Sequence, residues 1–236
     1  MTPLRPTLLA VAHGTRDAQG VAVVEALVGR VRALRPELRV ERCFLDLVAP
    51  ALPAALARLA GDVVLVPLLL GAGYHLRVDI PAALAGAPRV NARVARALGP
   101  HPLLADALAD RLADAGWRPA RGPVVLAAAG STDPAANADA AAVAALLHRR
   151  LPGAPRVVPA YLCAAGPTPA AAVAALRAEG HHRVTVAPYL LGPGFFARRA
   201  AGAGACRTSA PLGAHDALAR LVALRYDEAS GRALRA

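Results

Sequence analysis

Three ionisable side chains that could bind a metal ion or move a proton lie in the first half of the chain: His13, Asp46 and His75. Imidazole binds iron, cobalt, nickel and zinc, and it accepts protons near neutral pH. A carboxylate beside it attracts the cation, orients the ring or stabilises its protonated form. These residue types predict one site that combines metal binding with proton transfer.

Each of the three residues also has a purely structural interpretation. Either histidine could form a hydrogen bond within its own loop, and Asp46 could serve the N-terminus of a helix that starts near Pro50. Asp46 could otherwise be a third metal ligand or the group that orients a histidine. A repeat along the chain bears on this choice.

The chain contains one sequence pattern twice. Four segments recur in the same order, between 114 and 121 residues apart. The matched segments are 8–17 with 124–133, 44–50 with 161–167, 66–71 with 187–192, and 98–101 with 212–215. Four matches in one order are not expected by chance, so we interpret the chain as two copies of one domain.

The second copy lacks the three ionisable groups. The residues at the positions of His13, Asp46 and His75 are Ala129, Cys163 and Phe196. A duplicated scaffold with one set of reactive side chains indicates a single active site, which favours the functional interpretation of both histidines.

The length of the chain and its breaks predict two domains. The 236 residues suit two domains of ordinary size, and the glycines and prolines between Gly116 and Pro123 break any periodic element. We expect an N-terminal domain over 1–119 that carries the metal and base residues. A C-terminal domain over 120–236 would lack them and close the cleft.

Apolar runs rich in valine and leucine alternate with helical patterns in both halves. The runs predict strands over 8–12, 40–45, 63–70, 90–98, 124–128, 157–162, 184–191 and, more weakly, 205–210. Helical spacing predicts helices over 21–34, 134–151, 168–179 and 215–226. Strands buried on both faces and joined by helices predict an α/β fold of two tandem flavodoxin-like domains, each with a mostly parallel sheet.

This fold would bring the candidate residues together. His13, Asp46 and the loop over 71–75 each follow a predicted strand, and ligands of open parallel sheets bind beyond the carboxyl ends of the strands. Gly71 and Gly73 would let the backbone approach a ligand closely.

Other polar and sulfur-containing residues receive structural predictions. His101, His215, Thr15 and Asp133 are predicted to be loop or helix-capping residues. The three cysteines lack metal-binding spacing and are predicted to be small buried apolar residues; they are Cys43, Cys163 and Cys206.

The composition limits the partners. The formal net charge is +11 and all 27 basic residues are arginine, which pairs with carboxylates and phosphates. Aromatic residues make up 3% of the chain and no nucleic-acid-binding motif is present, so we expect a small polyanionic substrate and no nucleic acid. No apolar run is long enough for a membrane span, so a cytoplasmic protein without a membrane partner is expected.

These motifs together resemble those of the class II chelatase family, the sirohydrochlorin chelatases that insert cobalt or iron into a tetrapyrrole. The resemblance covers nearly the whole chain. The segments that carry it are 11–17, 44–46 with Pro50, 66–70 followed by His75, 79–81, 130–134 and 188–191. It implies two chelatase-like α/β domains and metal handling by His13 and His75. Many relatives have Glu where this chain has Asp46, so direct contact of this shorter side chain with the metal stays open.

The expected function is insertion of Fe2+ or Co2+ into sirohydrochlorin for sirohaem or cobalamin biosynthesis. Two pyrrole protons must leave the ring, and a pair of neutral histidines can bind the metal and accept protons. The metal is then a substrate, with no permanently bound cofactor. Four arginines in loops that should line the cleft would bind the carboxylates of the tetrapyrrole: Arg16, Arg77, Arg198 and Arg199.

Three alternatives remain at this point. The chain could insert nickel or another metal, or it could be a non-catalytic carrier of a metal or tetrapyrrole. A flavin or nucleotide binder is disfavoured because the loop over 13–17 lacks a glycine-rich phosphate cradle. In each case we expect a monomer with pseudo-twofold symmetry.

Overall fold

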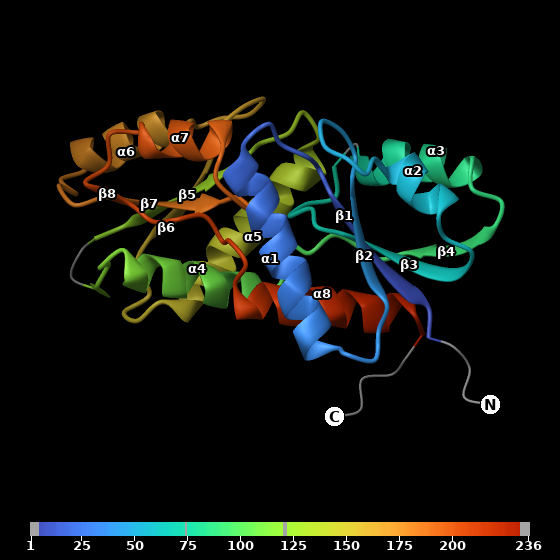
Figure 1. The fold of residues 1–236 in the computed structure, drawn as a ribbon. Coiled ribbons are helices and arrows are strands. Elements are labelled where there is room, and N and C mark those ends of the chain that lie inside the picture. The colour runs from blue at the N-terminus through green and yellow to red at the C-terminus, as the bar shows by residue number, and fades with distance from the viewer. Residues whose placement is uncertain (1–4, 74, 120–121, 232–236) are drawn as a thin grey trace. The chain divides into compact units, whose positions relative to one another are not determined.

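The structure is a computed structural model that describes residues 5–73, 75–119 and 122–231. The first sequence copy forms β1 (Thr7–Ala12), α1 (Ala18–Leu34), β2 (Val40–Phe44), α2 (Leu52–Ala57), β3 (Gly61–Pro67), the π-helical turn η1 (His75–Asp79), α3 (Ile80–Ala85), β4 (Val90–Val94) and α4 (Pro102–Asp114). The second copy forms β5 (Val124–Ala128), α5 (Pro134–Arg150), β6 (Val157–Tyr161), α6 (Pro169–Ala178), β7 (Thr185–Tyr189), α7 (Phe195–Ala201), β8 (Arg207–Thr208) and α8 (Asp216–Ala229). Figure 1 shows these elements along the chain.

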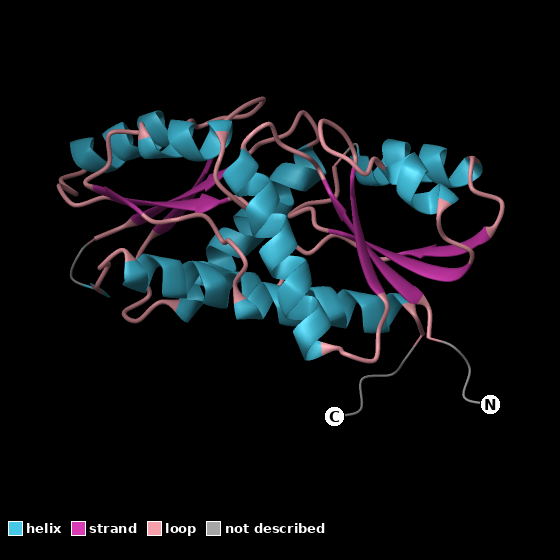
Figure 2. Cartoon of the chain, viewed as in Figure 1, coloured by secondary structure: helices cyan, strands magenta, loops and turns pink. Residues whose placement is uncertain are grey.

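The predicted α/β fold with parallel sheets is confirmed. Within the described ranges the strands form two four-stranded parallel sheets, in the orders β2-β1-β3-β4 and β6-β5-β7-β8 (Figure 2). The central strands β1 and β5 are buried almost throughout, as their apolar runs predict for strands covered on both faces. The fourth strand of each sheet is shorter than predicted, since β4 ends at Val94 and β8 is the pair Arg207–Thr208.

Each sheet carries helices on both faces. In the first sheet, α2 and α3 cover one face through a core that includes Leu9, Val11 and Leu56. In the second sheet, the equivalent core under α6 and α7 includes Val125, Ala127 and Leu176. This layering leaves the loops at the strand ends as the places where side chains of different strands can meet.

The compact units differ from the sequence copies in their last helix. One unit contains the chain up to Leu98 together with the residues from Leu218 on, and the other runs from Gly99 to Ala217. Helix α4, at the end of the first copy, therefore belongs to the second unit, where it packs on α5 and β7. Most of α8 belongs to the first unit. The domains predicted over 1–119 and 120–236 follow the copies and stay a prediction.

Equivalent arginines hold the two exchanged helices. Arg111 of α4 donates two hydrogen bonds to the carbonyl oxygen of Leu212, at 3.1 and 3.0 Å. Arg225 of α8 donates to the carbonyl oxygens of Ala97 and Leu98, at 2.9 and 2.8 Å. Arg225 is 1% exposed and also contacts a carboxylate oxygen of Glu228 at 3.0 Å, so its charge is compensated inside the unit.

The predictions for the helix caps are largely confirmed. The imidazoles of His101 and His215 accept a hydrogen bond from the backbone N–H two residues further along, each at 3.1 Å, and Asp133 caps α5 in the same way at 2.9 Å. The prediction that Thr15 caps α1 is wrong. Asp17 is the cap, and the Thr15 hydroxyl instead accepts from the Asp17 N–H, because the loop contains one more turn before the helix.

The predicted burial of the cysteines is confirmed only for Cys43. Burial among apolar side chains raises the pKa of its thiol to about 12. Cys163 and Cys206 are exposed, because both lie in loops beside strand ends and not within a strand. None of the described helices is long and apolar enough to cross a membrane.

Candidate active site

The loops after β1 and β2 lie side by side at the carboxyl end of the first sheet. The Leu45 N–H donates to the carbonyl oxygen of Ala12 at 2.9 Å, and the Asp46 N–H donates to that of His13 at 3.0 Å. These bonds continue the pairing of the strands by two residues beyond their ends. These backbone hydrogen bonds therefore hold His13 and Asp46 next to each other.

Position 14 must be glycine for this arrangement to exist. Gly14 has a φ of +110°, and a Cβ atom there would lie 2.1 Å from the carbonyl oxygen of Asp46. Any larger residue would push the loop that carries His13 away from Asp46.

The His13 ring faces the Asp46 carboxylate. Its Nδ1 lies 3.4 Å from Asp46 Oδ1 and 3.3 Å from the carbonyl oxygen of Gly14, with the two side chains 49% and 47% exposed. Asp46 does not cap the following helix, because α2 begins at Leu52 and its N-cap residue, Ala51, has no side-chain hydrogen bond. The carboxylate is thus positioned to orient the ring and attract a cation.

His75 has a carboxylate partner of its own. Its Nδ1 lies 2.5 Å from Asp79 Oδ2, within the turn η1. Residues four apart lie on the same face of a helical turn, and π-helical turns are frequent at functional sites. Asp79 lies in the segment 79–81 that carries the family resemblance, but no role was predicted for it. The four-residue spacing from His75 is the signal that could have identified it.

The two imidazoles contact each other. Their ring centroids are 4.4 Å apart and the ring planes stand at 89°. Strands β1 and β3 are adjacent in the sheet, so the segments that follow them converge. With Nδ1 of each ring directed at a carboxylate, a neutral imidazole carries its lone pair on Nε2, the atom that would take a metal ion or a proton.

This pair of histidines is the candidate metal site. Across the described residues, no group of three or more His, Cys, Asp or Glu side chains is arranged to hold a metal ion. Structural metal sites surround the ion with four protein ligands, whereas catalytic sites keep positions open. Two imidazoles alone would leave most coordination positions of an ion available to a second molecule.

The four candidate arginines fall into two pairs. Arg16 and Arg77 are exposed in the segments that carry His13 and His75, and Arg77 donates to the carbonyl oxygen of Ala72 at 3.1 Å. Arg198 and Arg199 are exposed on α7 of the second unit. The Arg199 guanidinium lies 5.7 Å from the centre of the Phe195 ring, and the Phe195 side chain is itself exposed.

The second unit repeats the backbone of the site without its histidines. The Leu162 and Cys163 N–H groups donate to Ala128 and Ala129 at 2.9 and 2.8 Å. Gly130 has a φ of +90°, and a Cβ atom there would lie 2.0 Å from the carbonyl oxygen of Cys163. The Cys163 thiol contacts the carbonyl oxygen of Ala129 at 3.1 Å. The scaffold is retained where the ionisable side chains are absent.

Comparison with known proteins gives one consistent family. The family model described as CbiX matches residues 7–115 and again 123–229. A sirohydrochlorin cobaltochelatase of Priestia megaterium is 31% identical over 61% of this chain, and the match covers 51% of that protein, about half its length. A sirohydrochlorin ferrochelatase of the same organism is 29% identical over 78% of this chain and 72% of the relative.

Solved structures show the same fold. SirB from Bacillus subtilis, solved with Fe3+, superposes with a TM-score of 0.79 at 24% identity, over 96% of each chain. CbiX, described as the terminal enzyme for siroheme biosynthesis in denitrifying bacteria, superposes with a TM-score of 0.72 at 26% identity, over 94% of this chain and 99% of that one.

Proposed function

The chain belongs to the CbiX family, and we propose on that basis that it is an enzyme that inserts Fe2+ or Co2+ into sirohydrochlorin. The relatives named above are sirohydrochlorin chelatases for these two metals. The observation that carries the proposal within this chain is the perpendicular contact of His13 and His75, each with a carboxylate at Nδ1.

The two histidines would serve first as ligands and then as bases. We propose that Nε2 of His13 and of His75 holds the divalent metal ion before insertion. When a pyrrole nitrogen replaces an imidazole on the metal, the released Nε2 is free to accept the proton that this nitrogen loses. Two imidazoles match the two protons that leave the ring, and the products are the metallated tetrapyrrole and two protons.

The carboxylates would support both steps. Asp46 and Asp79 add negative charge beside a cation and stabilise an imidazolium once it forms. We assign them to orientation and charge, and the two imidazoles to the metal. The Nδ1 contacts of 3.4 and 2.5 Å support this division, because a proton held on Nδ1 leaves the lone pair of a neutral imidazole on Nε2.

The arginines would bind the second substrate. Sirohydrochlorin carries many peripheral carboxylates, and a guanidinium binds a carboxylate through two parallel hydrogen bonds. Arg16 and Arg77 lie in the segments that hold the histidines, and Arg198 and Arg199 lie in the equivalent region of the second copy. A monomer, a cytoplasmic location and the absence of a resident cofactor remain predictions.

Anaerobic absorbance spectroscopy tests the proposal. The purified protein is mixed with excess sirohydrochlorin and Fe2+, Co2+ or Ni2+, and conversion is followed over many equivalents. An enzyme converts the excess, whereas a carrier of the metal or tetrapyrrole stops at stoichiometric binding. Comparing kcat/KM among the metals gives the intrinsic metal preference of the enzyme.

A double variant locates the site in the same assay. His13→Ala with His75→Ala should reduce insertion by about 100-fold or more, the usual contribution of general acid–base groups. The control is His148→Ala, which removes an exposed histidine whose Nδ1 lies 2.9 Å from the carbonyl oxygen of Pro155 in the second unit. Near-normal turnover of the double variant would refute this site.

A further inference from the structure

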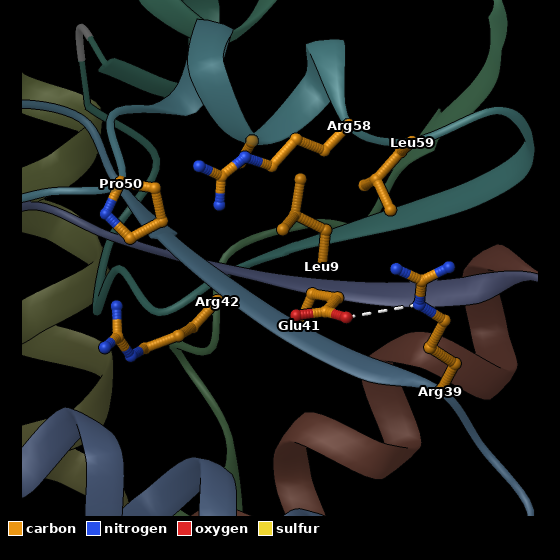
Figure 3. Close-up of a pocket in the computed structure, with 8 residues that line it drawn as sticks. Leu9, Arg39, Glu41, Arg42, Pro50, Arg58 and Leu59 are labelled. Carbon is orange, nitrogen blue, oxygen red and sulfur yellow. Dashed lines mark hydrogen bonds and ion pairs between the residues drawn. The ribbon is translucent and has the colours of Figure 1, made fainter.

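A pocket of about 220 Å³ opens beside β2, the edge strand of the first sheet (Figure 3). Its floor is apolar and includes Leu9 and Leu59, which are buried. Three arginines line it, Arg39, Arg42 and Arg58. The pocket is built from β1, β2 and α2 and contains none of the candidate catalytic residues.

The pocket holds more positive charge than its acidic neighbours compensate. Arg39 contacts Glu41 at 3.1 Å, the dashed line in Figure 3, and Arg42 forms an ion pair with Glu25. Within the described part of the chain, no acidic side chain forms an ion pair with Arg58, at the end of α2. In Figure 3 the Arg58 guanidinium extends towards Pro50 on the pocket side of β2, whereas that of Arg42 lies on the other side of the strand. One cationic group above an apolar floor therefore lacks a counter-ion.

The second copy has lost this charge. At the offset of 117 residues that relates Pro50 to Pro167, the positions of Arg42 and Arg58 are occupied by Pro159 and Ala175. The apolar floor is kept, because Leu59 becomes Leu176, which is also buried. The pattern is the same as for His13 and His75: the scaffold is duplicated and the charged side chains are not.

The replacement of Arg42 by proline also removes a backbone donor at the sheet edge. The Leu45 N–H points to β1 and the Phe44 N–H points outward to Pro50, so N–H groups alternate along this strand. The Arg42 N–H then faces the open edge next to the pocket. Proline at this position has no N–H, and proline is one of the residues by which edge strands are protected.

We propose that this pocket binds a carboxylate carried on a short aliphatic chain. Arg58 would hold the carboxylate, because a planar guanidinium group matches its two oxygens, whereas Arg42 is already engaged by Glu25 and by the carbonyl oxygen of Ala49. The apolar floor that includes Leu9 and Leu59 would contact the aliphatic part of the ligand. An inorganic anion has no such part. The carboxylate can belong to a free organic acid or to an acid side chain of the tetrapyrrole, and only the second source rests on the proposed function.

Direct binding tests the pocket without any activity measurement. Succinate and butyrate are titrated into the wild-type protein at constant ionic strength and followed by calorimetry or NMR. Arg58→Ala should weaken binding by at least about tenfold, the usual effect of losing a hydrogen bond to a charged group. The control, Arg177→Ala, removes one exposed arginine from the last turn of α6, the duplicate of α2, and should leave binding unchanged.

A second measurement identifies the source of the carboxylate. If it belongs to the tetrapyrrole, Arg58→Ala raises the KM for sirohydrochlorin while the KM for the metal stays constant, and free acids compete with the tetrapyrrole. If it belongs to a free acid, the variant loses succinate or butyrate binding and keeps both KM values. If the protein binds the acids in an Arg58-dependent way but has no chelatase activity, the binding role of the pocket is supported and the proposed function is refuted.

Two results would refute the proposal that this pocket binds a carboxylate. One is equal loss of acid binding in Arg58→Ala and Arg177→Ala, which would reduce the effect to net charge. The other is a wild-type protein that binds neither acid at millimolar concentration, together with an Arg58→Ala variant whose KM for sirohydrochlorin is that of wild type.

Discussion

Replacement of Asp79 tests whether the site depends on the orientation of His75. Asp79→Asn keeps the size of the side chain and an oxygen that can accept from Nδ1, but it removes the charge. Asp79→Ala removes the contact altogether. If the 2.5 Å contact fixes the ring with Nε2 outward, both variants should weaken metal binding, and alanine should weaken it more.

The size of the effect follows from the exposure of the pair. A hydrogen bond to a charged group contributes about 1.5 to 3 kcal/mol and a neutral one about 0.5 to 1.5 kcal/mol. The His75 and Asp79 side chains are 35% and 40% exposed, so solvent screening favours the lower values. Asp79→Ala should then cost about 1.5 kcal/mol, or roughly tenfold in metal affinity. Asp79→Asn should cost about 1 kcal/mol, or roughly fivefold.

The assay separates orientation from general stability. Co2+ binding is followed by the visible absorbance that imidazole coordination gives, and insertion rates are measured at saturating sirohydrochlorin with Co2+ varied. A matched control is Asp110→Asn, which changes another histidine–aspartate pair, 3.2 Å from His215 Nε2 in the second unit. Wild-type Co2+ spectra and a wild-type KM for metal in both Asp79 variants would show that Asp79 is only a surface residue of η1.

Four further predictions follow from the same structure. Asp46→Asn should slow insertion and leave tetrapyrrole binding nearly unchanged, since the charge beside His13 is lost; identical rates at every pH and metal concentration would exclude a role for that charge. Arg198→Ala should raise the KM for tetrapyrrole more than that for metal, in a salt-dependent way, and equal effects on both substrates would contradict this. In urea unfolding, Arg225→Ala should lower the free energy of unfolding by about 3 to 5 kcal/mol, because two buried bonds from a charged donor to the Ala97 and Leu98 carbonyl oxygens are lost. The more exposed Arg111→Ala should lower it by about 1 to 2 kcal/mol, and the reverse order would be the contrary result. Hydrogen bonds from Arg96 and Arg225 hold the pKa of Glu228 below its ordinary value of 4.5, so this carboxylate stabilises the fold above pH 4.5 and ceases to do so as the pH falls through its folded pKa. The difference in free energy of unfolding between wild type and Glu228→Gln should therefore shrink below pH 4.5. A difference that stays constant with pH would contradict this prediction.

Much of the site could be predicted because its position depends on local signals. Buried apolar runs mark the parallel strands, and residues directly after them must lie at the carboxyl edge of the sheet. That reasoning was enough to place His13 and His75 on neighbouring segments. The loss of both in the second copy gave independent support, which a single-domain sequence would not have offered.

The remaining features depend on contacts that leave no local signal. Helices α4 and α8 are amphipathic, which predicts that each packs on a core but not on which one. The bonds from Arg111 and Arg225 to loops far along the chain are among the contacts that hold them in place, and these leave no local signal. The role of Asp79 depends on a short helical turn over His75–Asp79, and the glycines and the proline around this segment predict a loop, so its four-residue spacing from His75 received no interpretation. The exposure of Cys163 follows from its loop, and the preference of cysteine for the interior misled the prediction.

The duplication provides a physical criterion for separating scaffold from chemistry. Gly14 and Gly130 are glycine in both copies because a Cβ atom would overlap a carbonyl oxygen at 2.1 and 2.0 Å, so any change there disrupts the loop. His13 and Asp46 are about half exposed and fill no core, so the second copy can replace them with little effect on its stability. A position kept in both copies thus reports a requirement of the fold.

The same criterion extends to the arginines. Arg111 and Arg225 occupy equivalent positions and make equivalent bonds to backbone carbonyl oxygens, which marks them as parts of the scaffold that hold the exchanged helices. Arg58 is absent from the second copy although the apolar floor beneath it is kept. A charge that the fold does not require, retained in the copy that also retains both histidines, is what the proposed ligand-binding role of Arg58 predicts.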